Sequence, residues 1–218
     1  MSKYVKILLQ AIALLSITLG VFSAQAMAKT NIQYEVINGD TLVISGNGET
    51  EEAIEYGKEV KESKIKKLII KEGITTTQKL RLGLFSNLKE INLPNSLVEI
   101  ADCSFMSNRK LEKVIFGKKT KIIGTNAFSG CTSLTNIELP ETVEQIQDGA
   151  FSECSRLKRI VLPKNLKEID IYALEHCPAL EIIINDSKIP CYMPWYKKYV
   201  TWRVDGKKTK TIPAGKTG

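Results

Sequence analysis

Apolar residues return along the middle of the chain with a period of 23 residues and without insertion. Each period places a leucine, an isoleucine and a second leucine in Leu-x-x-Ile-x-Leu, adds two apolar residues three positions apart, and ends in a small residue followed by a large one. The copies of the first leucine are Leu88, Leu111, Leu134, Leu157 and Leu180. Because one such unit is too short to enclose a core, stacked units must bury each apolar position against its copies.

Within one period the pattern predicts three short sides. Alternation in Ile-x-Leu indicates a strand in which Ile137 points inward while Asn136 and Glu138 point outward. A proline such as Pro140 then ends the strand, since it cannot donate to a ladder. The Val-x-x-Ile segment forms the second side, and the small residue beside the aromatic ring forms the third. Amphipathic helices are the alternative, but the repeated proline would break each of them in mid-pattern. We therefore predict a mainly β repeat solenoid.

The full pattern C-x-x-L-x-x-I-x-L-P-x-x-V-x-x-I-x-x-x-A-F resembles the BspA-like, Treponema-type leucine-rich repeat over residues 65–185. The resemblance implies a right-handed stack of about five 23-residue coils with β-hairpin caps at both ends. The coil at 108–130 departs from the pattern by carrying Asn108 for cysteine, Gly117 for proline and Thr120 for valine. We expect that coil, and the degenerate copy that precedes Leu88, to be the least well packed.

The first 28 residues have the features of a secretory signal peptide. Lys3 and Lys6 precede an apolar run, and small residues then allow cleavage after Ala26 or Ala28. Residues 7–26 alternatively form an uncleaved anchor, since about 20 apolar residues span a bilayer. No cysteine lies near the cleavage sites, which argues against a lipoprotein.

Residues 29–64 are predicted to cap the N-terminal end of the stack. Two β-rich runs within 32–45 meet at Asn38-Gly39, a strong hairpin signal. The acidic segment 51–62 forms a short helix or an irregular loop, and it is expected to cover the open apolar end of the first coil.

Residues 186–218 are predicted to form a basic, aromatic cap with a second hairpin around Asp205-Gly206. The formal charge of the chain is +7, and loss of Lys3 and Lys6 with the leader lowers it to +5. Seven basic side chains against one acid lie in 191–218, so the excess charge belongs to this end. It either forms a solvated cap face or contacts anionic wall polymers, acidic glycans or lipid headgroups. The candidate contact residues are Trp195, Tyr196, Lys197, Lys198, Trp202, Arg203, Lys207 and Lys208.

Three of the five cysteines, Cys131, Cys154 and Cys177, lie one period apart and are expected to stack in a column. Adjacent coils about 4.8 Å apart would allow a disulfide by distance alone. The side chains should point the same way into the core, which favours reduced and packed thiols. Cys103 and Cys191 lie outside the column and are expected to be the more reactive thiols.

Candidate catalytic chemistry is sparse in this sequence. The single histidine, His176, takes the place of Gly130 and Glu153 in earlier coils and is predicted to be a solvated turn residue. No cysteine spacing fits a zinc site, and no glycine-rich phosphate loop or calcium loop occurs. We therefore predict a protein that is not an enzyme and needs no cofactor or metal. An exported chain without a recognised binding motif is not expected to bind nucleic acid.

The outward residues of the repeated strand form two columns on one face of the predicted stack. The first column is Asn92, Ile115, Glu138, Val161 and Ile184, and the second is Glu90, Lys113, Asn136, Arg159 and Ile182. Exposed β-branched residues rimmed by charge are typical of a binding surface. Alternatively, they only favour strand formation.

The strand face and the resemblance together predict recognition. The resemblance implies a surface protein that mediates adhesion, so the expected function is protein–protein recognition at the bacterial cell surface or in the medium. Binding of carbohydrate or cell-wall polymer through the C-terminal segment is the alternative. We expect a secreted or cell-surface monomer, without an integral membrane segment after cleavage, whose ligand is a protein or glycan on a host or bacterial surface.

Overall fold

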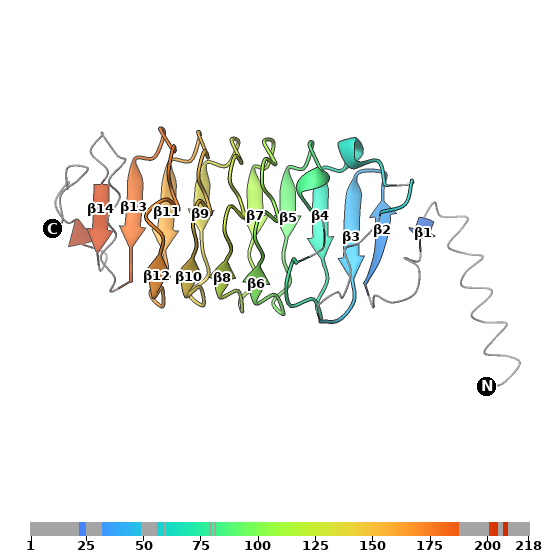
Figure 1. The fold of residues 1–218 in the computed structure, drawn as a ribbon, viewed down its shortest axis with the longest axis horizontal. Coiled ribbons are helices and arrows are strands. Elements are labelled where there is room, and N and C mark those ends of the chain that lie inside the picture. Colours follow the sequence, from blue (N-terminus) through green and yellow to red (C-terminus); the bar gives the residue numbers. More distant parts are fainter. Residues whose placement is uncertain are drawn as a thin grey trace, which may run out of the picture.

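The computed structural model describes residues 22–24, 32–48, 56–58, 60–78, 80, 82–187, 201–204 and 207–208. Short strands follow one another along the long axis in two rows (Figure 1). The first row begins with a sheet of β1 (Phe22–Ala24), β2 (Gln33–Ile37), β3 (Thr41–Ser45), β4 (Lys67–Ile70), β5 (Glu90–Asn92) and β7 (Lys113–Ile115). It continues as a sheet of β9 (Asn136–Glu138), β11 (Arg159–Leu162), β13 (Ile182–Asn185), β14 (Thr201–Val204) and β15 (Lys207–Lys208).

The second row consists of four two-residue strands from successive coils. These are β6 (Glu99–Ile100), β8 (Ile122–Ile123), β10 (Gln145–Ile146) and β12 (Glu168–Ile169). Two 3-10 turns, η1 (Glu62–Lys64) and η2 (Leu82–Leu84), complete the regular structure of the described residues.

Strands of neighbouring coils pair in parallel with a shift of one period. Glu90 pairs with Lys113 in β5 and β7, and Arg159 pairs with Ile182 in β11 and β13. The predicted mainly β solenoid is confirmed. Within the described residues the stack has six coils, whose first-row strands are β4, β5, β7, β9, β11 and β13. The degenerate first copy therefore folds as a complete layer.

The third side of each coil has no regular strand, yet it is hydrogen-bonded from layer to layer. Amide groups of Phe105, Phe128 and Phe151 each donate to an alanine carbonyl one coil further on, at 2.8 Å. The turn that follows uses a left-handed backbone at equivalent positions, which L-residues adopt only at a cost. These positions are Ser107 (φ 61°), Gly130 (φ 71°), Glu153 (φ 57°) and His176 (φ 54°). His176 is exposed there, as predicted for a turn residue.

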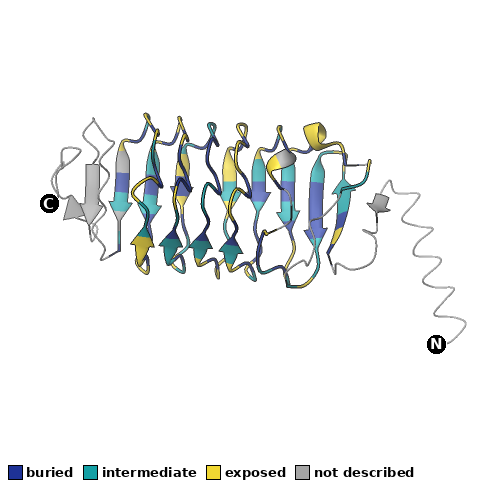
Figure 2. Ribbon diagram, viewed as in Figure 1, coloured by how far each residue is buried: buried dark blue, intermediate teal, exposed yellow. Residues whose placement is uncertain are grey.

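Buried positions recur in successive coils along the molecule (Figure 2). The rings of Phe105, Phe128 and Phe151 stack, with centroids 5.2 Å and 5.4 Å apart. Beside them the thiols of Cys131 and Cys154 are fully buried and donate to the carbonyls of Phe105 and Phe128 at 3.3 Å. Cys131, Cys154 and Cys177 are all buried, in agreement with the packed column expected from the sequence.

The coil at 108–130 is the irregular layer. Among the described strands, β7 and β9 belong to separate sheets, so the first-row ladder is interrupted at this coil. Val114 and Phe116 are only partly buried, whereas the equivalent residues of the next coil are buried. Asn108 is buried, and neither its amide nitrogen nor its amide oxygen has a hydrogen-bond partner among the described residues. These features agree with the weaker packing expected from the departures in sequence.

The predicted N-terminal hairpin forms between β2 and β3, with Gln33 opposite Ser45 and Ile37 opposite Thr41. The β3 strand then joins β4 in parallel, which extends the stack by one strand. Tyr34 packs edge-on against Tyr56, with centroids 5.1 Å apart, and its hydroxyl accepts a bond from the Gly57 amide. Residues 51–55 and 59 of the predicted covering segment lie outside the described residues.

At the other end, β14 pairs in parallel with β13 and antiparallel with β15. The backbone of these strands forms the predicted second hairpin, with Val204 opposite Lys207. The predicted leader lies outside the described residues except for 22–24, whose backbone pairs with β2. No helix in the described part of the chain is long and apolar enough to cross a membrane. The limits of the leader and of the two caps remain predictions.

Candidate functional site

The outward residues of the first-row strands form one surface, here called the strand face. Backbone register aligns its members in two columns within each sheet. One column is Lys67, Glu90 and Lys113, continued by Asn136, Arg159 and Ile182. The other is Ile69, Asn92 and Ile115, continued by Glu138, Val161 and Ile184. All ten residues that the sequence placed in these two columns therefore take the expected register positions.

Apolar side chains are partly open to solvent along the second column. Ile115 is 43% exposed, the largest value among the large apolar side chains of the described residues. Val161 and Ile184 are half-buried. Since Asn92 and Glu138 alternate with these residues, the stripe is an apolar line divided by polar groups rather than a continuous patch.

Ion pairs join neighbouring coils, one within the first column and one between the two columns. Lys67 Nζ lies 3.0 Å from Glu90 Oε1, and Arg159 Nη1 lies 2.9 Å from Glu138 Oε1. Lys113, between these two pairs, is exposed and has no carboxylate partner among the described residues. The centre of the strand face thus combines the most exposed isoleucine of the described residues with an ammonium group that has no carboxylate partner among them.

Two members of the face, Lys67 and Ile69, were not identified from the sequence. They belong to the degenerate first coil, in which Leu68 and Ile70 keep the inward phase of the repeat. That phase is the signal that would have placed both residues on the face.

The predicted C-terminal contact residues are not available for a geometric test. Trp195, Tyr196, Lys197 and Lys198 lie outside the described residues. Trp202, Arg203, Lys207 and Lys208 lie in β14 and β15, for which only the backbone is described.

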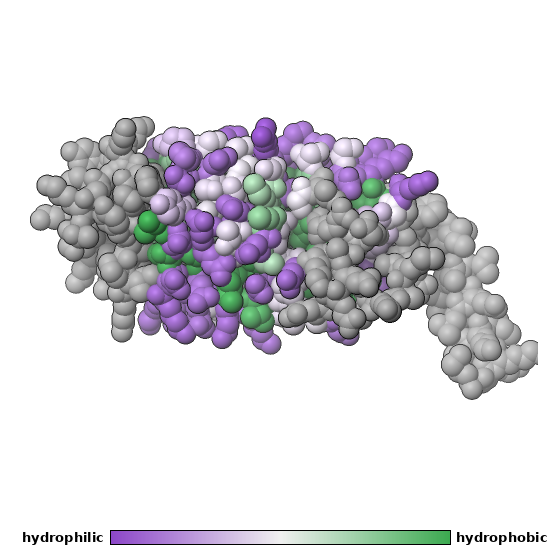
Figure 3. All heavy atoms as spheres, viewed as in Figure 1, coloured by the Kyte–Doolittle hydropathy of each residue, from purple (hydrophilic) through white to green (hydrophobic). Residues whose placement is uncertain are grey.

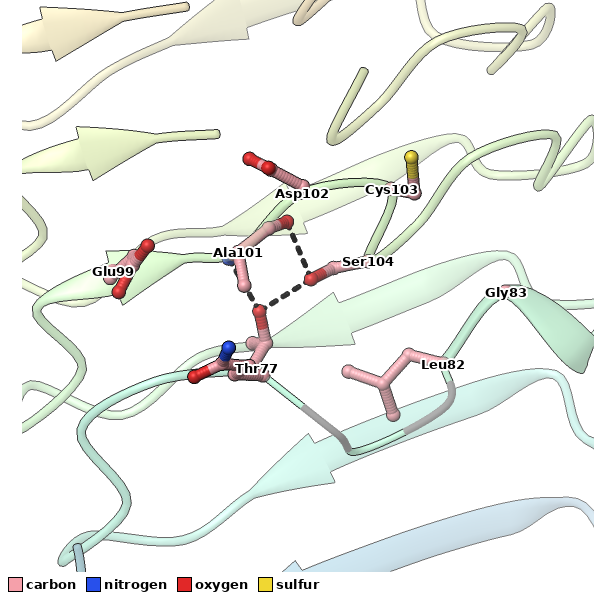
Figure 4. A pocket seen from close by; sticks show the side chains of 9 residues that line it. Thr77, Leu82, Gly83, Glu99, Ala101, Asp102, Cys103 and Ser104 are labelled. Atoms are coloured by element: carbon pink, nitrogen blue, oxygen red, sulfur yellow. Dashed lines mark hydrogen bonds between the residues drawn. The ribbon is translucent and has the colours of Figure 1, made fainter. Parts of the chain in front are cut away.

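A depression of about 370 Å³ lies on another side of the molecule, between the first and second coils. The Thr77 hydroxyl bonds to the Ser104 hydroxyl at 2.6 Å and accepts the Ala101 amide at 2.8 Å. Figure 4 shows the side chains of Asp102 and Cys103 directed away from this buried pair. The two hydroxyls bond to each other and to the backbone of Ala101, so they act as structural links between coils rather than as a nucleophile and base.

Titratable groups of the described residues do not form a catalytic or metal-binding cluster. No group of three histidine, cysteine, aspartate or glutamate side chains in this part of the chain could hold a metal ion. His176 Nδ1 lies 3.9 Å from Glu175 Oε1 at the surface.

The column thiols are poor nucleophiles because burial disfavours their thiolate form. Burial raises the pKa of Cys131 to about 12 and raises that of Cys154 as well. Cys103 is exposed and free, and Cys191 lies outside the described residues.

Residues 84–190 match the sequence pattern described as the BspA type leucine rich repeat region, in six copies. No curated protein matches the chain significantly.

Several solved structures are similar in fold. A leucine-rich repeat protein from Eubacterium ventriosum has a TM-score of 0.60 and 18% identity, over 84% of this chain and 46% of that one. The T. pallidum leucine rich repeat protein has a TM-score of 0.53 and 20% identity, over 76% and 84% of the two chains. A leucine rich cell surface protein from Faecalibacterium prausnitzii has a TM-score of 0.47 and 24% identity, over 72% and 38%. This chain therefore spans less than half the length of the first and third of these structures.

Proposed function

Because residues 84–190 belong to the BspA-type leucine-rich repeat family, we propose that the chain is an exported recognition protein that binds another protein through its strand face. Stacked repeats present an extended surface made from equivalent positions of many coils, which suits binding of a macromolecule. Six coils about 4.8 Å apart give a surface roughly 24 Å long from first to last strand. That length is adequate for an interface of about 800 Å² per partner.

The observation that carries the proposal is the exposure of Ile115 at 43% in the middle of the strand face. Half-buried Val161 and Ile184 continue its column, and charged groups border it. Interfaces commonly have an apolar centre and a polar rim, and their affinity is concentrated in a few central side chains. The composition of the strand face fits this arrangement.

Export and adhesion complete the proposal. The leader predicted at 1–28 would direct the chain out of the cytoplasm to the cell surface or the medium. The partner would then be a protein on a host or bacterial surface. Recognition rather than catalysis is favoured because the described residues form no metal-binding cluster and the single histidine, His176, is exposed at a turn.

The test is the double variant Ile115→Asp with Val161→Asp, compared with the matched control Met106→Asp with Ile171→Asp. Met106 and Ile171 are 42% and 41% exposed but lie outside the strand face. Purified proteins are measured for binding to bacterial and host-cell surfaces and for melting temperature. We expect the strand-face variant to lose most binding at an unchanged melting temperature, while the control binds like the wild type. Equal binding by both variants would reject the strand face as the site.

Binding of a wall polymer or acidic glycan by the C-terminal segment is a second candidate. The register of its hairpin sets Arg203 opposite Lys208, and like charges in such positions repel unless an anion lies between them. Substitution of both residues by glutamine should reduce retention on isolated cell walls and leave protein binding by the strand face unchanged. Full retention would exclude this candidate.

A further inference from the structure

A second surface feature lies at the N-terminal end of the stack, away from the strand face. It is a shallow depression of about 630 Å³ between the hairpin turn after β2 and the loops that lead into β4, β5 and β7. These loops lie along the upper edge of the molecule in Figure 1, near the end that carries β2 and β3. In Figure 3 that edge is predominantly hydrophilic. The depression, here called the lysine depression, is lined by Lys64, Lys66, Lys89 and Lys110.

Four ammonium groups face a single lining carboxylate, that of Asp40. Lys66 Nζ is 3.4 Å from Asp40 Oδ2, and Lys89 Nζ is 3.4 Å from Glu112 Oε1, outside the lining. Both lysine side chains remain more than half exposed, at 59% and 52%. Ion pairs of this length between exposed groups contribute little to stability, so a bound anion can replace them easily.

The other two lysines have no carboxylate partner among the described residues. Lys110 Nζ donates to Asn87 Oδ1, and the Asn87 amide in turn donates to the Ser63 carbonyl at 2.5 Å. Lys64, at the end of η1, is exposed. The depression therefore carries a local excess of positive charge that the described part of the chain does not neutralise.

The positions of Lys64 and Lys66 are occupied by Ser133 and Thr135 three coils further on, and by the exposed Arg156 and Lys158 in the coil after that. Basic residues therefore recur on this edge. Where the hairpin turn meets the first three coils, they line a hollowed surface.

We propose that the lysine depression is a binding site for an anionic polysaccharide. Its lysines come from three successive coils, so their backbones spread over about 10 Å along the axis. That span exceeds a single compact anion and suits charges repeated along a polymer. Lysine supplies point charges without the planar fork that arginine offers to phosphate.

The uncharged lining favours a sugar over a polymer that carries phosphate alone. Asn38 and Ser63 are exposed in the lining, and their side chains make no hydrogen bond to a described residue. An amide and a hydroxyl can donate to and accept from sugar hydroxyls. Polyphosphate has only acceptors, so it would leave the Asp40 carboxylate facing another anion.

The test measures binding of dextran sulfate, unsulfated dextran and polyphosphate to the full chain at low and physiological ionic strength. The variant Lys64→Gln with Lys110→Gln removes the two lysines that lack a carboxylate partner. The control, Lys119→Gln with Lys164→Gln, removes two exposed lysines outside the lining. The basic C-terminal segment is intact in both variants, so any binding by it is common to them.

We expect the depression variant to bind dextran sulfate about tenfold more weakly than the wild type, with the difference reduced by salt, while the control retains its affinity. Unsulfated dextran should bind neither protein measurably. An equal loss in both variants, or no loss in either, would overturn the site. Polyphosphate binding as tight as that of dextran sulfate, with the same dependence on Lys64 and Lys110, would overturn the polysaccharide as its ligand. None of these measurements depends on binding of a protein by the strand face.

Discussion

Phe128 and Phe151 occupy the same position in successive coils, with ring centroids 5.4 Å apart and ring planes only 2° from parallel. Phe105 extends the stack on the other side, at 5.2 Å and 16°. Each of these three buried rings stacks on its own copy in a neighbouring coil, so the coils must keep both spacing and orientation for the column to fill space. The column couples three coils whose residues are otherwise distant in the sequence.

The phenylalanine column should therefore dominate the stability of the central coils. Replacing the fully buried Phe128 by alanine leaves a cavity between two rings, and we expect a loss of about 3–5 kcal/mol in the free energy of unfolding. Chemical denaturation followed by circular dichroism provides the measurement. Met106→Ala, at an exposed site, is the control and should change stability little. A loss below about 1 kcal/mol for Phe128→Ala would contradict the structure.

Asn108 is a defect in the core that can be repaired. Its buried amide lacks partners, and the next coils carry cysteine at the same position. We expect Asn108→Cys to stabilise the fold by about 1–3 kcal/mol, because it removes the penalty of an unsatisfied buried group. The reverse change, Cys154→Asn, should destabilise it. The explanation fails if Asn108→Cys unfolds at lower denaturant concentration than the wild type.

Gly117 is required although the repeat pattern has proline at its position. A Cβ atom there would overlap the Pro94 carbonyl, lying 2.6 Å from its carbon. Gly117→Ala and Gly117→Pro are both expected to destabilise the protein by about 1–3 kcal/mol, against the sequence pattern. At Gly83 the nearest atom to an added Cβ is 3.7 Å away, so Gly83→Ala serves as the tolerated control. The melting temperatures of the three variants are compared with that of the wild type. An unchanged melting temperature for Gly117→Pro would show that the coils of Pro94 and Gly117 can move apart.

The cysteine column should resist alkylation in the native state. Iodoacetamide is expected to modify the exposed Cys103 while Cys131, Cys154 and Cys177 react only after unfolding, as followed by peptide mass spectrometry. Rapid native labelling of Cys154 would be incompatible with its burial.

The same thiols make stability depend on alkaline pH. Burial raises the pKa of Cys131 and Cys154 in the folded state, to about 12 for Cys131, while the unfolded thiol ionises near 9.0. Their contribution is therefore complete below pH 9 and is lost as the pH rises toward the folded value. Replacing Cys131 by serine should flatten this alkaline loss in a series of melts, and an unchanged profile would exclude the thiol as its source.

Glu144 lies between two lysines on the second row of strands, 3.2 Å from Lys121 Nζ and 2.5 Å from Lys167 Nζ. The bonds from Lys167 and then Lys121 lower the pKa of its carboxyl below the ordinary 4.5. Its stabilising effect is therefore present above pH 4.5 and disappears as the pH falls through the lower folded value. Glu144→Gln should lower the melting temperature at neutral pH and match the wild type in strong acid. Equal melting temperatures at neutral pH would show that the ion pairs of Glu144 with Lys121 and Lys167 do not stabilise the fold.

The sequence was sufficient for the coil architecture because each layer repeats the same inward positions. Spacing alone aligned Leu111, Leu134 and Leu157, and Asn38-Gly39 located the turn of the first hairpin. The alternation within each strand also predicted which residues point outward. The residues expected on the strand face therefore occupy matching register positions in neighbouring strands.

Other features depend on contacts that no local pattern encodes. The interruption between β7 and β9 arises where Val114 and Phe116 are less buried than their counterparts. Thr77 is a buried polar residue, and its hydroxyl pairs with the hydroxyl of Ser104. The lysine depression combines residues of the hairpin turn with residues of three coils, and only their stacking reveals it.

The regular shift of one period between paired strands has a genetic consequence. Each internal layer offers its neighbours matching upper and lower surfaces, so an in-frame duplication of one period inserts a unit between two surfaces that already accept it. Unequal crossing-over between the repeated stretches of the gene can thus change the reach of the molecule in fixed steps. The length of the stack can therefore be inherited and changed by recombination, because an added coil packs in the same way as the existing ones.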